Sequence, residues 1–352
     1  MRYAKILIVT NIENPYRHLQ FQIISKSVDL SVYFTHHIPK HRNWSPVGNT
    51  DYRKEKNLIK LLLNRKFEKI VVIENGLSSV CYVALFCLAL IFKGTDLILW
   101  VGNNEYSVKS RLLKRLLYRV YFTTLSIFYR KALYYSEKSK TFFDRYNLGR
   151  RVENFSITGQ QYPFQQEYGC APQKAILIPD IRNRPVRFLF IGQDIERKGL
   201  KDIVGELNYL NNVVCQGISV QLAGGVFEEI VSQLTCDTSV IPFANADCKK
   251  ALFRGCDFLL VPSKHEPWGH VVTEALGFGV LPIISSSAGV SNIPHDFYSI
   301  PEKLYIWRQG VVSLKEIMEE LKYAGGSEFN LSLAGYNMLF NLDEFARELR
   351  KL

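Results

Sequence analysis

Two acidic side chains, Glu266 and Glu274, lie on either side of a predicted turn and helix start. Pro267 and Gly269 favour the turn, and the apolar run after them favours the helix. The first backbone amides of a helix have no acceptor inside it, so the amides of residues 268–271 offer an anion site. A nucleotide-sugar has phosphates, which backbone amides can bind, and hydroxyl groups, which carboxylates can bind. This turn offers amides with a carboxylate on either side.

The segments around this turn are typical of a parallel sheet. Residues 258–261 form an apolar run that ends at Pro262 and predict a buried strand. Gly277 and Pro282 end the helix, and a second strand begins at residues 283–284. The turn therefore connects a strand to a helix that returns the chain to the same sheet.

Written as E-P-W-G-x-x-x-x-E-A-x-x-x-G, residues 266–279 resemble the E-x7-E signature of the family 4 glycosyltransferases, the glycosyl transferases group 1. The alternative is an ordinary strand-to-helix connection with solvated acids. The resemblance implies an α/β chain with the GT-B fold, two Rossmann-like, doubly wound parallel-sheet domains that face each other across a cleft. It also implies a nucleotide-sugar donor, transfer to a hydroxyl group and retention of the anomeric configuration.

The segment GQDIERKG at residues 192–199 resembles a second element of the same family, G-R-x-x-x-x-K-G. Lys198 matches the lysine of that element, whereas Gln193 stands where the arginine is usual. In the family these two cations hold the donor diphosphate, so Arg197 is the candidate for the missing charge. A departing nucleoside diphosphate gains negative charge as the glycosidic bond breaks, and Lys198 would stabilise that charge.

The resemblance assigns the ribose hydroxyls to Glu274 and the transferred sugar to Glu266, and it places two residues after a predicted strand near the base. The expected donor-binding residues are Gly192, Gln193, Arg197, Lys198, Pro242, Phe243, Glu266, Pro267, Trp268, Gly269, His270, Val271 and Glu274. The chain contains no D-x-D pair, which metal-dependent glycosyltransferases of the other main fold use to hold an ion. We therefore expect a UDP- or GDP-linked sugar, no metal and no cofactor.

The first half of the chain is expected to hold the acceptor. A buried strand at residues 5–10 leads into a loop at 11–17, and a helix is expected over 18–27. Ligands of open parallel sheets lie at the carboxyl ends of the strands. The candidate acceptor-side residues in this loop are Asn14, Pro15, Tyr16 and Arg17.

Glu105 follows the predicted strand at 96–101 and resembles the acid found after the matching strand in related enzymes. It is the acceptor-side candidate for a catalytic group, either a base or a hydroxyl-positioning residue, beside Glu266 and Lys198. An acid favoured by the dipole at a helix start is the alternative.

A chain of 352 residues with 47% hydrophobic and 22% charged residues suits a globular protein of two domains. We expect an acceptor domain at 1–180, a donor domain at 181–335 and a terminal helix at 336–352 that crosses back to the first domain. Seven scattered cysteines without a C-x-x-C pair argue against a disulfide framework and for a reducing compartment. The N-terminal residues predict a strand rather than a signal peptide.

The excess of basic over acidic residues lies entirely in the first half of the chain. Residues 1–150 contain 25 Lys and Arg against 10 Asp and Glu, whereas the remainder has a net charge of −4. Within 109–131, basic residues alternate with leucines, as in a basic amphipathic helix on an anionic membrane. No nucleic-acid motif accompanies this charge. We expect a cytoplasmic protein, peripheral at the inner face of the membrane, without a nucleic-acid partner.

The expected function is therefore that of a retaining, metal-independent, hexosyltransferase-type enzyme. Its acceptor would be a glycan or a lipid-linked molecule in surface polysaccharide or glycoconjugate biosynthesis. One alternative is a nucleotide-sugar epimerase on the same fold. Another is a non-catalytic nucleotide-binding protein, which the glutamine at position 193 favours.

Overall fold

The computed structural model divides into two compact units, Met1–Pro163 with Asn341–Leu352, and Phe164–Phe340. The structure describes residues 4–13, 15–36, 50–57, 67–74, 95–101, 112–128, 131–134, 136–147, 153–157, 161–213, 217–264, 266, 268–343 and 346.

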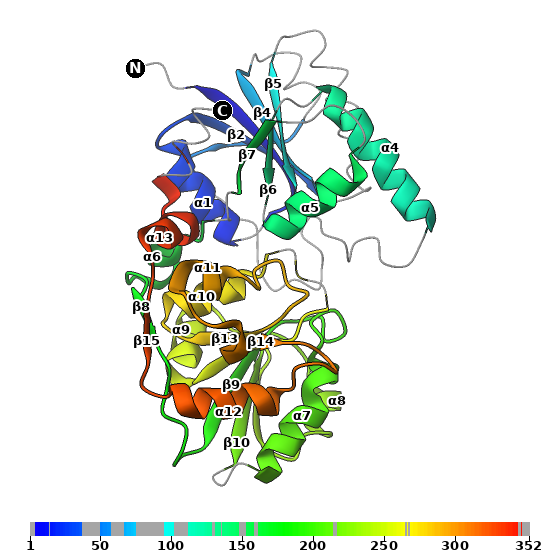
Figure 1. The fold of residues 1–352 in the computed structure, drawn as a ribbon. Coiled ribbons are helices and arrows are strands. Elements are labelled where there is room, and N and C mark those ends of the chain that lie inside the picture. Colours follow the sequence, from blue (N-terminus) through cyan, green and yellow to red (C-terminus); the bar gives the residue numbers. More distant parts are fainter. Residues whose placement is uncertain are drawn as a thin grey trace. The chain divides into compact units, whose positions relative to one another are not determined.

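The first unit is built on one sheet (Figure 1), whose parallel strands have the order β3-β2-β1-β4-β5-β6-β7. These strands are β1 (Lys5–Ile12), β2 (Asp29–His36), β3 (Arg53–Glu55), β4 (Lys69–Glu74), β5 (Asp96–Val101), β6 (Lys131–Tyr134) and β7 (Glu153–Ile157). The central strands read as continuous apolar runs because a parallel sheet is covered on both faces. In β1, for example, Ile6, Leu7 and Ile8 are fully buried.

Helices α1 (Pro15–Ser25), α4 (Leu112–Phe128) and α5 (Glu137–Tyr146) belong to the first unit. Aromatic rings join α4 to α5, because Phe122 lies 4.9 Å from Phe143 and 5.8 Å from Phe142 between ring centres. The expected loop through residue 17 is wrong: α1 begins at Pro15, whose fixed φ and missing amide suit the first helical position.

The second unit repeats this plan with the parallel order β11-β10-β9-β12-β13-β14 (Figure 1). Its sheet strands are β9 (Val186–Ile191), β10 (Ile218–Ala223), β11 (Asp237–Ile241), β12 (Phe258–Val261), β13 (Leu281–Ser285) and β14 (Ile306–Trp307), and a separate antiparallel pair joins β8 (Ala175–Leu177) to β15 (Glu328–Asn330). The helices are α6 (Phe164–Tyr168), α7 (Leu200–Val213), α8 (Glu228–Val231), α9 (Ala246–Gly255), α10 (His270–Gly277), α11 (Ile293–Tyr298), α12 (Leu314–Ala324) and α13 (Leu333–Phe340), with a 3-10 turn at Glu302–Leu304. Both sheets therefore have the doubly wound order, and in the second the direction of growth reverses between β9 and β12.

The first unit ends at Pro163, earlier than the expected boundary at residue 180. The residues that follow pack on the second unit, because Phe164 is 1% exposed and its ring lies 4.8 Å from that of Phe278. The terminal segment begins at Asn341 rather than at residue 336. Helix α13 stays with the second unit since the ring of Phe340 lies 5.8 Å from that of Phe164.

Two loops at the carboxyl edge of the second sheet meet at Gly199. A Cβ atom at this position would lie 2.0 Å from the carbonyl oxygen of Pro262, and φ is +68°. The backbone amide of Lys264 also donates to the carbonyl oxygen of Arg197 at 3.0 Å. Glycine is therefore what lets the loop after β9 lie against the loop after β12.

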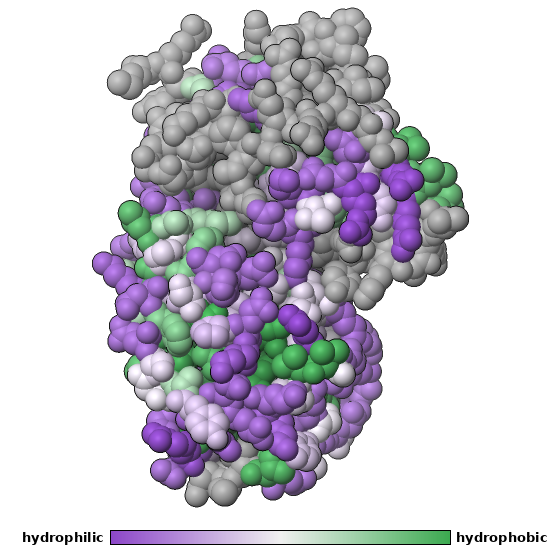
Figure 2. Space-filling view, in the orientation of Figure 1, coloured by the Kyte–Doolittle hydropathy of each residue, from purple (hydrophilic) through white to green (hydrophobic). Residues whose placement is uncertain are grey.

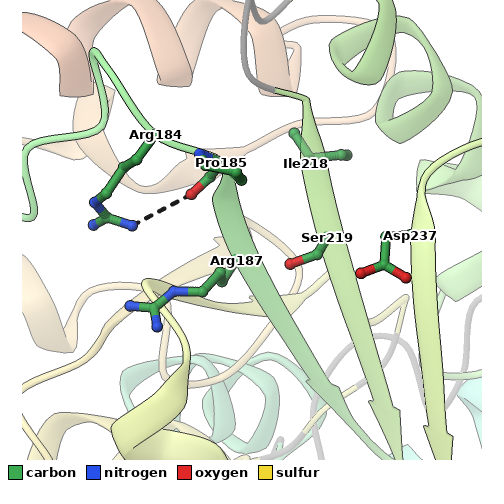
Figure 3. Close-up of a pocket in the computed structure, with 6 residues that line it drawn as sticks. All are labelled: Arg184, Pro185, Arg187, Ile218, Ser219 and Asp237. Carbon is green, nitrogen blue, oxygen red and sulfur yellow. Dashed lines mark hydrogen bonds between the residues drawn. The ribbon is translucent and has the colours of Figure 1, made fainter.

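At the opposite edge of this sheet, the buried carboxylate of Asp257 joins β9 to β12. It accepts hydrogen bonds from Arg184 Nη1 at 2.7 Å and from the Arg187 backbone amide at 2.9 Å. The two arginines, with Pro185 and residues of β10 and β11, line an open pocket of about 670 Å³ (Figure 3). Because Asp257 binds both guanidinium groups, we interpret this feature as a structural clamp.

The clamp makes stability depend on pH. Burial alone would raise the pKa of Asp257, but hydrogen bonds from Arg184 and Arg187 outweigh it and lower the pKa below its usual value. Asp257→Asn should lower the free energy of unfolding at pH 7 by about 2 kcal/mol. A lowered folded-state pKa stabilises above the unfolded-state pKa of about 4, and this stabilisation is lost as the pH falls through the folded-state value.

Urea unfolding at pH 7 and at pH 3 should therefore show a smaller difference between wild type and variant at pH 3. Asp180→Asn is the control, because it removes an exposed carboxylate that pairs with Arg182 and should change stability little at either pH. A difference between wild type and Asp257→Asn that stays constant with pH would contradict this account.

Gly199→Ala should destabilise the second unit by about 2 to 4 kcal/mol, since the new methyl group meets the Pro262 carbonyl and φ is positive. Gly205→Ala is the matched control. Gly205 lies within α7, and no atom lies within 4 Å of the place that a methyl group would take, so alanine there should stabilise by about 0.5 to 1 kcal/mol. Thermal unfolding measures the Tm of both variants. A change of Tm in the same direction for Gly199→Ala and Gly205→Ala would refute the close approach at Gly199.

Candidate functional site

The candidate site lies at the carboxyl edge of the second sheet, beside the point where the strand order reverses. The loop after β9 and the loop after β12 flank this point, and the Gly199 contact holds them together. In doubly wound sheets this is the crevice that receives ligands. Both motifs expected from the sequence, residues 192–199 and 266–274, are brought here.

The backbone around Glu266 is fixed by its neighbours. Glu266 forms a parallel bridge with Ala288, and its carbonyl oxygen accepts a hydrogen bond from the amide of Gly289 at 2.7 Å. Gly269 has φ +92°, and a Cβ atom there would lie 3.1 Å from Glu266 Cγ. The glycine thus allows the chain to turn tightly around the Glu266 side chain before α10 begins.

Two cations of the loop after β9 bind the carboxylate of Glu266. Lys198 Nζ donates to Glu266 Oε2, and Arg197 Nη1 lies 3.5 Å from the same oxygen. Glu266 is 9% exposed, so its charge is mostly removed from water. Lys198 and Arg197, the residues predicted to neutralise a diphosphate, therefore converge at one point of the site.

A second ion pair lies along α10. The carboxylate of Glu274 is 4% exposed and accepts from Lys249 Nζ at 3.0 Å. Glu167 Oε1 lies 4.0 Å from the same ammonium group. Burial disfavours the charge on Lys249, but the two carboxylates outweigh it and raise the pKa of Lys249 above its usual value.

The start of α10 presents polar groups. Gly269 is the residue before the helix, and the Val272 amide donates to its carbonyl oxygen at 2.8 Å. Among the described residues, Ser263 Oγ, Trp268 Nε1 and Thr273 Oγ1 are buried without a hydrogen-bond partner. Buried polar atoms are normally satisfied, so these three have hydrogen-bonding capacity left at or near the helix start.

The other predicted donor-side residues fall at strand ends and at the start of α10. Gln193 is exposed in the loop after β9, and Pro242 and Phe243 are exposed directly after β11. His270 and Val271 are the first residues of α10. Gly192 follows β9, and its amide donates to the Ala223 carbonyl at the end of β10. Pro267 lies outside the described residues.

The predicted acceptor-side residues of the first unit are only partly described, because Asn14 and Glu105 lie outside the described ranges. Pro15, Tyr16 and Arg17 form the first turn of α1. Arg17 is 3% exposed, and its guanidinium carbon lies 5.0 Å from the ring centre of Trp100. The structure therefore buries Arg17 instead of displaying it on a loop.

A buried polar cluster beside this turn was missed by the sequence analysis. His18 Nε2 lies 2.7 Å from Glu13 Oε1, and the hydroxyl of Tyr52 contacts His18 Nδ1. Lys54 Nζ pairs with the other oxygen of Glu13 at 2.5 Å. Burial lowers the pKa of His18 despite the nearby Glu13 carboxylate. A neutral His18 can thus accept from Tyr52 and donate to Glu13.

Lys249 was also missed, together with Glu167. Neither belongs to a motif, and they are 25 and 107 residues from Glu274 in the sequence. Two successive lysines at 249–250 are an ordinary feature of a surface helix. Only the packing of α6 and α9 beside α10 brings Lys249 and Glu167 to the site.

Comparison with known proteins agrees with this geometry. Residues 178–299 match the family model of the glycosyl transferases group 1. Granule-bound starch synthase 1 of Arabidopsis thaliana is 28% identical over 133 residues, which are 37% of this chain and 22% of the synthase. Glycogen synthase of Thermodesulfovibrio yellowstonii is 32% identical over 114 residues, 30% of this chain and 22% of that enzyme. The matches thus span about a fifth of the length of these relatives.

Solved structures resemble the whole chain. Anabaena HepE in complex with UDP and glucose has a TM-score of 0.67 at 13% identity, covering 99% of this chain and 100% of HepE. Sucrose-phosphate synthase from Thermosynechococcus elongatus has the same TM-score and identity, covering 99% and 98%. WaaG, a glycosyltransferase involved in lipopolysaccharide biosynthesis, has a TM-score of 0.59 at 14% identity, covering 98% and 94%. The chain therefore has the GT-B fold, and residues 178–299 of it are similar to the glycosyl transferases group 1.

Proposed function

We propose that this chain transfers a sugar from a UDP- or GDP-linked donor to a hydroxyl group, with retention of configuration. The observation that carries the proposal is the convergence of Lys198, Arg197 and Glu266 beside the start of α10, at the reversal point of the second sheet. The family match supports a nucleotide-sugar donor. So does HepE, which shares the fold and was solved with UDP and glucose.

The proposed reaction breaks the bond between the anomeric carbon of the sugar and an oxygen of the diphosphate, which keeps the electron pair. An acceptor hydroxyl oxygen forms the new bond to that carbon on the same face, and its proton passes to the departing diphosphate oxygen. Lys198, Arg197 and the first amides of α10 stabilise the charge that develops on the diphosphate. Glu266 gives up these cations to the phosphates and accepts hydrogen bonds from the transferred sugar.

In this proposal fixed cations do the work for which other glycosyltransferases use a metal ion. Lys198 and Arg197 already share one carboxylate oxygen, so both can reach one anionic ligand. Turnover with a UDP- or GDP-sugar that persists in excess EDTA is the expected result. The proposed catalytic groups are Lys198, Glu266 and Glu105, the last of which lies outside the described residues.

Lys198→Met should lower kcat/KM for a UDP- or GDP-sugar donor by at least 100-fold, because it removes a charge aimed at the leaving group. Lys201→Met is the matched control. Lys201 lies on the same loop-to-helix segment, but it pairs with Glu196 and Glu229 at the surface. Thermal stabilisation by UDP, GDP and their sugars selects the donor beforehand, because ligands that prefer the folded state raise Tm.

Equal activity of the Lys198→Met and Lys201→Met variants would contradict the proposed donor site. Product analysis separates the two rival functions from transfer. An epimerase converts the donor without any acceptor, and a non-catalytic binding protein gains Tm with the nucleotide but releases none from any donor.

We place the acceptor at a membrane, and helix α4 is the reason. Leu113, Leu116, Leu117 and Val120 are between 44% and 66% exposed, and the spacing i, i+3, i+4, i+7 puts them on one face. The opposite face of α4 is buried through Tyr118, Tyr121 and Phe122. Figure 2 shows the hydrophobic patch at α4 beside hydrophilic side chains. An apolar stripe of this kind marks an interaction site.

The charge beside this stripe favours a lipid surface. Arg115 and Arg119 are exposed on α4, and residues 1–150 carry most of the positive charge of the chain. None of the described helices is both long and apolar enough to cross a bilayer. In the proposal the protein is cytoplasmic and binds the inner face of an anionic membrane, where a lipid-linked glycan serves as acceptor. WaaG and the galactosyltransferase WaaB, which share the fold, are lipopolysaccharide enzymes.

Leu113→Gln with Leu116→Gln should abolish binding to vesicles of phosphatidylglycerol and phosphatidylcholine in a sedimentation assay, because it removes the inserting side chains. Arg115→Gln with Arg119→Gln should weaken binding to the same vesicles about 30-fold, since each cation near an anionic surface contributes about 1 kcal/mol. Val311→Gln, at an exposed apolar residue of the second unit, is the control. Donor hydrolysis should be unchanged in all three, and undiminished sedimentation of the leucine variant would rule out this surface.

A further inference from the structure

Glu274 is almost completely removed from water, and burying a carboxylate is costly unless a cation or several hydrogen-bond donors lie beside it. The cation is Lys249, whose ammonium group lies 3.0 Å from Glu274 Oε1. Lys249 itself is held between Glu274 and Glu167. Since both carboxylates raise its pKa, Lys249 carries its charge throughout the neutral range.

The position of Lys249 on its helix indicates a specific role. Helix α9 begins after Asn245, whose side chain accepts from the Cys248 amide at 2.9 Å. Lys249 follows within the first turn, where the helix dipole disfavours a positive charge. The neighbouring Lys250 is used differently, since its ammonium group donates to the backbone oxygen of Tyr168 at 3.0 Å. The favourable interactions of Lys249 therefore come from Glu274 and Glu167.

The geometry of a carboxylate explains what this contact does for a ligand. Two oxygens offer about four acceptor positions. Lys249 occupies one of them on Oε1 and so fixes the rotation of the group about its last bond. A cis-diol, such as the 2′- and 3′-hydroxyls of a ribose, has two donors with the spacing of two carboxylate oxygens.

We propose that Lys249 is a positioning residue, which holds the Glu274 carboxylate oriented to accept both hydroxyls of the donor's ribose. The inference rests on the proposed function and on the role that the family resemblance implies for Glu274, which is to bind that ribose. Lys249 acts through Glu274 and does not touch the nucleotide. Loss of Lys249 therefore costs the protein its preference for a ribonucleotide over a 2′-deoxyribonucleotide.

Calorimetric titration with UDP and 2′-deoxy-UDP, and with GDP and 2′-deoxy-GDP, measures this preference. Wild type should bind the ribonucleotide at least tenfold more tightly, because a hydrogen bond to a charged acceptor contributes about 1.5 to 3 kcal/mol. Lys249→Met should bring the ratio to within about twofold of unity. Lys249→Arg keeps the charge and should recover part of the ratio, and Lys250→Met should keep it in full.

A second comparison excludes a role in folding alone. Removing one partner of a buried pair leaves an uncompensated charge, whereas removing both is often tolerated. The double variant Lys249→Met with Glu274→Gln should therefore fold, which its Tm checks. Its ribonucleotide affinity should equal that of Glu274→Gln alone, because Lys249 has no carboxylate left to orient. A further loss of affinity in the double variant would overturn the inference.

The remaining outcomes separate this inference from the proposed function. If wild type binds a nucleoside diphosphate but Lys249→Met keeps the full ribose preference, the role of Lys249 is wrong and the donor site stands. If wild type binds the ribonucleotide and the deoxyribonucleotide equally well, the role of Lys249 is again wrong and the donor site stands. If wild type binds neither UDP nor GDP, both proposals fail.

Discussion

Charges held out of water at one edge of the second sheet are the constraint on which the site depends. Glu266 and Glu274 are each less than a tenth exposed, and a buried carboxylate is costly without a cation. Lys198 and Arg197 form ion pairs with Glu266, and Lys249 forms one with Glu274. The site is therefore assembled from ion pairs whose members lie on different loops and helices, and the sheet must bring these together accurately.

The sheet does so through its strand order. Because the order reverses between β9 and β12, the loops that follow these two strands open side by side at the carboxyl edge. Gly199 then allows backbone contact between them, and Gly269 allows the chain to turn around Glu266. Neither contact tolerates a side chain without displacement. The two glycines thus allow the close backbone approaches that bring the charged side chains together.

Helix α4 has one face that is buried in the first unit and another that is exposed. Its buried face packs aromatic side chains against α5 and the first sheet, which explains Tyr118, Phe122 and their partners. Its other face exposes leucines that no packing within the described part of the first unit accounts for. From the sequence alone, leucines at this spacing are as compatible with core packing as with an exposed interaction surface. Burial of the aromatic face separates the two roles and leaves the leucine face to a partner.

The α/β class, the parallel doubly wound sheets and the two motifs of the candidate site could be predicted from the sequence alone, because strand runs, glycine turns and the E-x7-E spacing are local patterns. The sequence also placed Lys198 and Glu266 in one site. It did not determine the start of α1 at Pro15 or the boundary at Pro163, since the first follows from a helix cap and the second from the packing of Phe164 on Phe278. Only the tertiary structure brought Lys249 and Glu167 to Glu274, because such ion pairs form between side chains distant in sequence and leave no periodic pattern in it.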